Sequence, residues 1–91
     1  MGTEFRIVVD ADSAELAAAG ARAAFARIAA LDAELSDWKS DSELSRLSRQ
    51  PQGVPMTLGE DLCSVLTRAA EIRAATDGAF DVTVGPFVVL W

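Results

Sequence analysis

Apolar residues alternate at the start of this chain and then repeat with helical spacing. Residues 5–9 are β-branched or aromatic at most positions, which predicts a strand with Phe5, Ile7 and Val9 on one face. A long helix is expected over 13–35, with Asp12 as its N-cap. Its apolar positions step by four and three, so they share one face: Ala17, Ala21, Ala24, Ile28, Leu31 and Leu35.

Polar residues 36–39 break this pattern, and two further helices are expected after them. Ser40 is the expected cap of a short helix, which is followed by a loop rich in proline and glycine over 50–55. Thr57 is expected to open the next helix, which extends to about Thr76. Its positions at helical spacing are Leu62, Val65, Leu66, Ala69, Ile72 and Arg73. Gly78 is placed to end this helix in a left-handed conformation.

Residues 78–86 form a short alternating run between two glycines and a proline, which predicts an extended loop. Pro86 suits the first turn of a last helix. One strand, a long helix, a short helix, a third helix and an extended loop indicate an α+β fold. Because an isolated strand leaves its ladder groups unpaired, we expect an incomplete part of a larger two-layer α/β domain. Another chain or a C-terminal region would supply the rest of the sheet.

Composition and charge narrow the range of functions that this chain can have. The chain has 91 residues, 51% of them hydrophobic, which suffices for one small domain with one core. Its net charge is −6 and its basic residues do not cluster, which argues against a nucleic-acid surface. It has no histidine and a single cysteine, Cys63, expected to be partly buried. Disulfides within the chain and catalysis by a serine–histidine or cysteine–histidine pair are therefore excluded.

Compartment is not fixed by the sequence. No apolar stretch is long enough to span a bilayer, and Glu4 and Arg6 follow Met1 too closely for a signal peptide. The chain as it stands would be cytoplasmic. A signal peptide encoded upstream of Met1 would instead make the product periplasmic or membrane-anchored.

Three segments in order resemble the signatures of the FAD:protein FMN transferase family, the ApbE-like proteins. They are Met-Gly-Thr at 1–3, Leu-Ser-Asp-Trp at 35–38 with Asp-Ser-Glu-Leu-Ser-Arg-Leu at 41–47, and Thr-Asp-Gly-Ala-Phe-Asp-Val-Thr-Val-Gly-Pro at 76–86. The departures are small. Trp38 stands where the family often has tyrosine, Ser48 where asparagine is common, and Phe87 where leucine is common.

The resemblance implies that residues 1–91 are the N-terminal part of a single FMN-transferase-like domain. In the family, a magnesium-dependent reaction moves FMN from FAD to a threonine or serine hydroxyl of a target flavoprotein and releases AMP. The magnesium ligands are expected outside this chain, and no residue here is assigned as catalytic or metal-binding. The resemblance therefore implies part of an FAD-binding surface in a chain that is inactive alone.

The resemblance assigns FAD contacts to Met1, Trp38, Ala79, Phe80 and Asp81. The Trp38 indole would stack on a flat ring, typically worth about 1–3 kcal/mol, or else fill a core between helices. A glycine-led loop at 79–81 would offer backbone N–H groups, and Asp81 would accept hydrogen bonds from ribose or adenine.

Each assignment has a structural alternative. Phe80 would pack in the core, Asp81 would cap a turn, and Met1 would be a fraying initiator residue. Two other functions also stay open. One is a flavin-binding module without transfer chemistry. The other is an interaction module that forms homo-oligomers through the alanine-rich helix and the unpaired strand.

Overall fold

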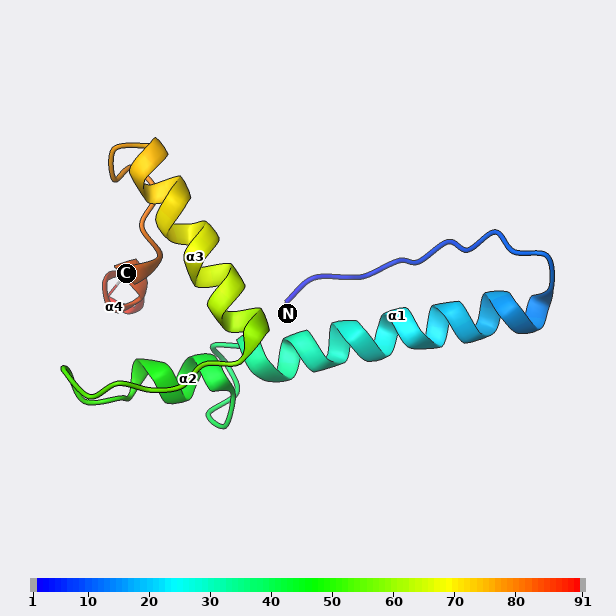
Figure 1. Cartoon of the computed structure of the whole chain (residues 1–91), viewed down its shortest axis with the longest axis horizontal. Helices are drawn as coiled ribbons and strands as arrows, with labels where there is room; N and C mark the ends of the chain where they lie inside the picture. The colour runs from blue at the N-terminus through cyan, green and yellow to red at the C-terminus, as the bar shows by residue number, and fades with distance from the viewer. Residues whose placement is uncertain (1, 91) are drawn as a thin grey trace. The chain divides into compact units, whose positions relative to one another are not determined.

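The structure is a computed structural model that describes residues 2–90, and it divides the chain into two units, Met1–Thr57 and Leu58–Trp91 (Figure 1). Each unit is helical and is described by itself. The first unit contains α1 (Ala14–Leu35) and α2 (Glu43–Ser48). The second contains α3 (Glu60–Ala75), the 3-10 helix η1 (Val82–Val84) and α4 (Gly85–Val89).

The long helix α1 has the face that the sequence predicts. Every residue of the predicted apolar face is half-buried, while most of the positions between them are exposed. The helix begins one residue later than expected, because its N-cap is Ser13, whose Oγ accepts a hydrogen bond from the Leu16 backbone N–H at 3.2 Å. The prediction of Asp12 as the cap is wrong.

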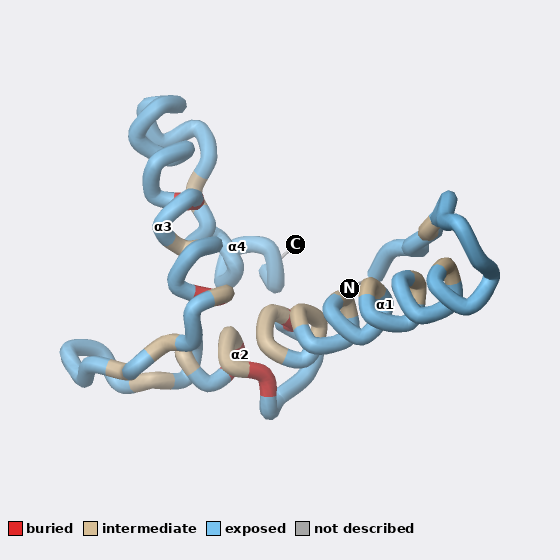
Figure 2. The backbone as a smooth tube through the Cα atoms, turned by 45° about the vertical axis from the view of Figure 1, so that its right-hand side comes forward, coloured by how far each residue is buried: buried red, intermediate tan, exposed pale blue. Residues whose placement is uncertain are grey.

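Residues 5–9 do not form a strand. Residues 2–12 are an extended chain that starts beside the C-terminal part of α1 and runs alongside the helix to its N-terminal end (Figures 1 and 2). Ile7 is half-buried, whereas Val8 is almost fully exposed. A strand requires a neighbour that pairs with its backbone groups, and residues 2–90 offer none. The predicted α+β fold is therefore wrong for the described part of the chain, in which every regular element is a helix.

The short helix α2 also starts later than expected. Its N-cap is Ser42, whose Oγ accepts from the Ser45 backbone N–H at 3.0 Å, so the prediction of Ser40 as the cap is wrong. Leu44 and Leu47, the predicted apolar side, are half-buried. The most deeply buried positions of this unit are instead polar, as Figure 2 shows in red: Ser36, Ser42 and Ser45.

In the second unit, α3 follows the predicted periodicity only in part. Leu62 and Ala69 are buried, but Val65 and Ile72 are exposed. The helix is capped by Gly59 without a side-chain hydrogen bond, so Thr57 does not open it as predicted. Gly78, with φ +81°, confirms the predicted left-handed termination.

The segment after α3 is not the extended loop that the sequence predicts. It turns through η1 directly into α4, and Pro86 occupies the first turn of α4, as expected. The β-branched run 82–84 forms a turn of 3-10 helix because the Asp81 side chain caps it. No helix within residues 2–90 combines the length and apolar character needed to cross a membrane.

Candidate functional site

Trp38 lies in the turn between α1 and α2, and its side chain points into solvent. It is 88% exposed, the most exposed aromatic side chain of the described residues. The alternative in which Trp38 fills a core between helices is therefore wrong for this structure. An exposed indole of this size presents a large apolar face that is available to a flat ligand or a partner.

The turn that carries Trp38, residues 36–41, is fixed at several points, and we call it the Trp38 turn. Ser42 Oγ donates to the Ser36 carbonyl at 2.6 Å, and the Ser42 backbone N–H donates to the Lys39 carbonyl at 3.1 Å. Lys39 Nζ lies 2.6 Å from an Asp32 carboxylate oxygen, and Arg49 donates to the Ser40 carbonyl. The side chain of Trp38 is thus exposed although its backbone is restrained.

The Lys39 ammonium lowers the pKa of Asp32, because its hydrogen bond favours the ionised carboxylate. Both side chains of this ion pair are partly open to water. Exposed ion pairs of this kind contribute little to stability. The hydrogen bond within the turn, between Ser42 and Ser36, is buried and is the stronger restraint.

The other predicted residues, Ala79, Phe80 and Asp81, lie together in the second unit in a turn at the end of α3, residues 76–84, which we call the Asp81 turn. Its backbone donors bond within the chain, to Arg73 of α3 and to Thr76 just after it. The Gly78 N–H donates to the Arg73 carbonyl at 2.9 Å, and the Ala79 N–H donates to the Thr76 carbonyl at 3.1 Å. The Phe80 N–H donates to Thr76 Oγ1 at 3.1 Å. These three N–H groups, expected to face a ligand, are thus engaged within the chain.

Asp81 has the capping role that was its structural alternative. Its Oδ1 accepts from the Thr83 N–H at 2.9 Å and from Thr83 Oγ1 at 2.7 Å. Its Oδ2 accepts from Arg73 Nε at 2.9 Å. The hydrogen bonds from Thr83, followed by that from Arg73, lower the pKa of Asp81 to about 2.

Side chains of the Asp81 turn remain open to solvent although its backbone is engaged. Phe80 is 43% exposed, so its ring is neither a core side chain nor fully solvated. Ala79 is exposed as well. Met1, the remaining predicted FAD contact, lies outside the described residues.

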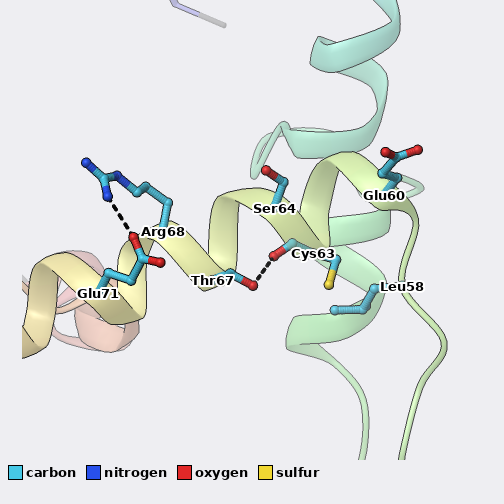
Figure 3. A pocket seen from close by; sticks show the side chains of 7 residues that line it. All are labelled: Leu58, Glu60, Cys63, Ser64, Thr67, Arg68 and Glu71. Carbon is cyan, nitrogen blue, oxygen red and sulfur yellow. Dashed lines mark hydrogen bonds and ion pairs between the residues drawn. The ribbon is translucent and has the colours of Figure 1, made fainter.

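A separate open hollow of about 630 Å³ runs along one side of α3 (Figure 3). Its lining residues are Leu58, Glu60, Cys63, Ser64, Thr67, Arg68 and Glu71. Arg68 Nη1 is paired with Glu71 Oε2 at 2.6 Å, and Thr67 Oγ1 donates to the Cys63 carbonyl at 2.8 Å. With these groups engaged and none of the predicted residues present, the hollow is better described as one face of α3 than as a ligand site.

Cys63 in this hollow is exposed, so the expectation of a partly buried thiol is wrong. Within residues 2–90, no three acidic or cysteine side chains come together in an arrangement that could hold a metal ion. No chemical step through a metal ion is derived from the described residues.

Comparison with known proteins decides the family. A sequence model of the ApbE family matches residues 1–91. The chain belongs to the ApbE family. This confirms the resemblance that its three sequence motifs indicate.

Relatives of this ApbE-family chain are FAD:protein FMN transferases. The one from Klebsiella pneumoniae is 39% identical over 92 residues, which is all of this chain and 26% of the relative. The one from Escherichia coli K12 is 35% identical over 91 residues, again 26% of its length. The one from Haemophilus influenzae is 44% identical over 62 residues, 67% of this chain and 18% of the relative.

The chain thus spans about a quarter of the length of the transferases that it matches from end to end. No solved structure matches it. In this ApbE-family chain, Trp38 belongs to the first unit and the Asp81 turn to the second, so the predicted residues fall in two groups.

Sequence reasoning missed the residues that hold these two groups in place. Ser42 fixes the Trp38 turn, and Arg73, Thr76 and Thr83 fix the Asp81 turn. The spacing of Thr83, two residues after Asp81, is a recognisable capping signal. The sequence pattern places Arg73 on the third helix but does not predict its pairing with Asp81, which is eight residues away.

Proposed function

We propose that this chain forms part of the FAD-binding surface of an FAD:protein FMN transferase. The observation that carries the proposal is the exposure of Trp38, 88% of whose side chain meets solvent on a restrained turn. A large apolar ring at the surface is costly to leave in water, and stacking on a flat heterocycle would remove one of its faces from water. The flavin or adenine ring of FAD has the required shape.

The Asp81 turn would contribute through side chains. Because the Gly78, Ala79 and Phe80 N–H groups are engaged, contacts to FAD would come from the half-exposed Phe80 ring and the Asp81 carboxylate. Asp81 already accepts three hydrogen bonds, and an ionised carboxylate has about four acceptor positions, so about one position stays open to a ribose or adenine donor.

The reaction of the whole protein would be the transfer of FMN from FAD to a threonine or serine hydroxyl of a target flavoprotein, with release of AMP and with magnesium as cofactor. The names of the relatives support an FMN transfer from FAD to a protein. Because the chain spans about a quarter of such a relative, we expect it to bind FAD weakly and to transfer no FMN alone.

Binding can be tested by titrating FAD into the ¹⁵N-labelled chain and following the indole N–H signal of Trp38 by NMR, which detects weak binding. We expect this signal to shift and Trp38→Ala to weaken binding by about 5- to 100-fold, as the loss of one stacked ring would. Phe25→Ala is the matched control, because Phe25 is an exposed aromatic residue of α1. Equal effects of the two substitutions would count against the proposal.

The expected inactivity has its own test. The purified chain is incubated with FAD, magnesium and a target flavoprotein, and covalent flavin is detected by its fluorescence after denaturing electrophoresis. We expect no labelled target. A labelled target would show that these 91 residues hold the whole catalytic apparatus, contrary to the proposal.

A second candidate function, an interaction module, is favoured by the exposed apolar side chains of α4 and the residue after it. Phe87, Val88, Val89 and Leu90 are all at least 65% exposed. Light scattering with and without FAD would test self-association at increasing concentration. A monomer at every concentration would contradict this candidate without touching the first.

A further inference from the structure

The buried positions of the first unit are unusual in their chemistry. Among residues 2–57, the three buried ones are all serines: Ser36, Ser42 and Ser45. Ser42 is the most deeply buried of them, at 1% exposure. A buried hydroxyl is costly unless its hydrogen bonds are satisfied, so the contacts of Ser42 decide what this cluster does.

The hydroxyl of Ser42 makes two bonds at once, one as donor and one as acceptor. It donates to the Ser36 carbonyl at 2.6 Å and accepts from the Ser45 N–H at 3.0 Å. The first bond closes the turn that begins where α1 ends, and the second caps α2. A single side chain therefore joins both ends of the Trp38 turn to the helices that flank it.

Two more contacts restrain the far side of the same turn. Lys39 is paired with Asp32 of α1, and Arg49 after α2 donates to the Ser40 carbonyl. Trp38 lies between the buried restraint at 36 and the surface restraints at 39–40. Since surface pairs are weak, the buried hydroxyl is the strongest side-chain restraint on the turn, and it acts beside the backbone hydrogen bond from the Ser42 N–H to the Lys39 carbonyl.

We propose that Ser42 is a positioning residue that holds the Trp38 turn in the conformation that presents the indole to a flat aromatic ligand. The proposal rests on the proposed function and deepens it, since the ligand is the flavin or adenine ring of FAD. Ser42 itself does not touch the ligand. It lowers the entropy lost on binding, because the turn is ordered before the ring arrives.

The test uses the whole chain in a Trp91→Phe background, in which Trp38 is the sole indole. Ser42→Ala is expected to increase the mobility of the Trp38 indole, measured by ¹⁵N relaxation of its N–H, and to weaken FAD binding by about 3- to 10-fold. Ser42→Thr keeps the hydroxyl and is therefore expected to keep most of the indole order and most of the FAD affinity. Helical content from circular dichroism is recorded for every variant.

Two matched controls separate positioning from general loss of structure. Ser13→Ala removes the N-cap of α1, far in sequence from the turn, and Ser48→Ala removes a hydroxyl bonded to the Leu44 carbonyl within α2. Neither is expected to change indole mobility or FAD affinity. If Ser42→Ala melts α2, Ser45→Ala takes its place, because it removes the longer 3.5 Å contact to the same Ser36 carbonyl and leaves the cap.

The outcomes distinguish this inference from the proposed function. If Trp38→Ala leaves FAD affinity unchanged, the proposed function fails. If Trp38→Ala weakens binding while Ser42→Ala alters neither indole mobility nor affinity, the positioning role of Ser42 is overturned and the proposed function stands. If Ser13→Ala weakens FAD binding as much as Ser42→Ala does, the positioning role of Ser42 is also overturned.

Discussion

Arg73 Nε donates to Asp81 Oδ2 at 2.9 Å, across a span of eight residues. The pair ties Asp81 to α3 through side chains, while the Gly78 N–H and the Ala79 N–H close the same turn through backbone hydrogen bonds. The two restraints differ in their sensitivity to conditions. The backbone bonds are insensitive to pH, whereas the side-chain pair exists only while the carboxylate is ionised.

Asp81 is expected to titrate far below an ordinary aspartate. Its pKa is about 2 in the folded chain, against the ordinary value of 3.8, because Thr83 and Arg73 stabilise the ionised form. The stability that it contributes is therefore complete above about pH 4 and is lost as the pH falls through about 2. Carboxyl-carbon NMR should give the low midpoint. A midpoint near 3.8 would contradict the observed geometry.

The two partners of Asp81 should contribute unequally to this shift. Thr83→Val removes the hydroxyl donor and Arg73→Gln removes the cation, and each should raise the pKa of Asp81. Because hydrogen bonds from Thr83 are the largest cause, Arg73→Gln alone should leave the pKa below 3.8. Full recovery of the ordinary value in Arg73→Gln would show that Thr83 has no part in it.

Alanine should have opposite effects at two glycines. Gly78 has φ +81°, so Gly78→Ala should destabilise the end of α3 by about 1 kcal/mol. Gly20 lies inside α1, where an added Cβ would meet nothing within 4 Å apart from its chain neighbours and the backbone of the helix itself, so Gly20→Ala should stabilise that helix by about 0.5–1 kcal/mol. Thermal unfolding followed by circular dichroism measures both, and effects of the same sign would contradict the assignment.

Asp77 also has a positive φ, +52°, without being a glycine. Asp77→Gly relieves that backbone conformation and should leave stability equal or higher, by up to about 1 kcal/mol. Asp77→Val should lower it, because a β-branched residue does not tolerate this region. Unfolding midpoints of the two variants provide the comparison, and equal midpoints would be inconsistent with a left-handed Asp77.

Two neighbouring residues, Asp12 and Ser13, are candidates for the N-cap of α1, and the structure assigns the cap to Ser13. Ser13→Ala should destabilise the helix by about 0.5–2 kcal/mol, because the Leu16 N–H loses its acceptor. Asp12→Ala should have little effect by comparison. Amide hydrogen exchange in the first turn of α1 measures the difference, and a larger effect of Asp12→Ala would restore the cap that the sequence predicts.

Periodicity predicted most of the helical structure correctly because it reports local geometry. The face from Ala17 to Leu35 follows from steps of three and four residues, and Gly78 follows from the need for a left-handed residue after α3. The N-cap residues of the helices were predicted less accurately than their apolar faces. Ser40 and Ser42 both precede an apolar run, and only the hydrogen bond that Ser42 Oγ accepts from the Ser45 N–H decides between them.

The strand over 5–9 was wrong because β-branched composition does not by itself create a partner. The run 82–84 was similarly misread as extended, since Asp81 supplies a cap that alternation does not reveal. For the candidate FAD-binding surface, the sequence motifs indicated the segments that carry Trp38 and Asp81. The sequence could not show that the Trp38 side chain is exposed. The burial of a tryptophan depends on contacts between distant residues, which a local pattern does not contain.

The small number of buried apolar side chains should lower the heat-capacity change on unfolding. Among the described residues, only Leu62 and Ala69 are both apolar and buried, and the buried residues of the first unit are serines. Heat-capacity change on unfolding comes from newly wetted apolar surface, and exposed polar surface lowers it. The chain should therefore melt gradually, with a heat-capacity increment well below the roughly 1.2–1.5 kcal/mol/K of an ordinary 100-residue domain.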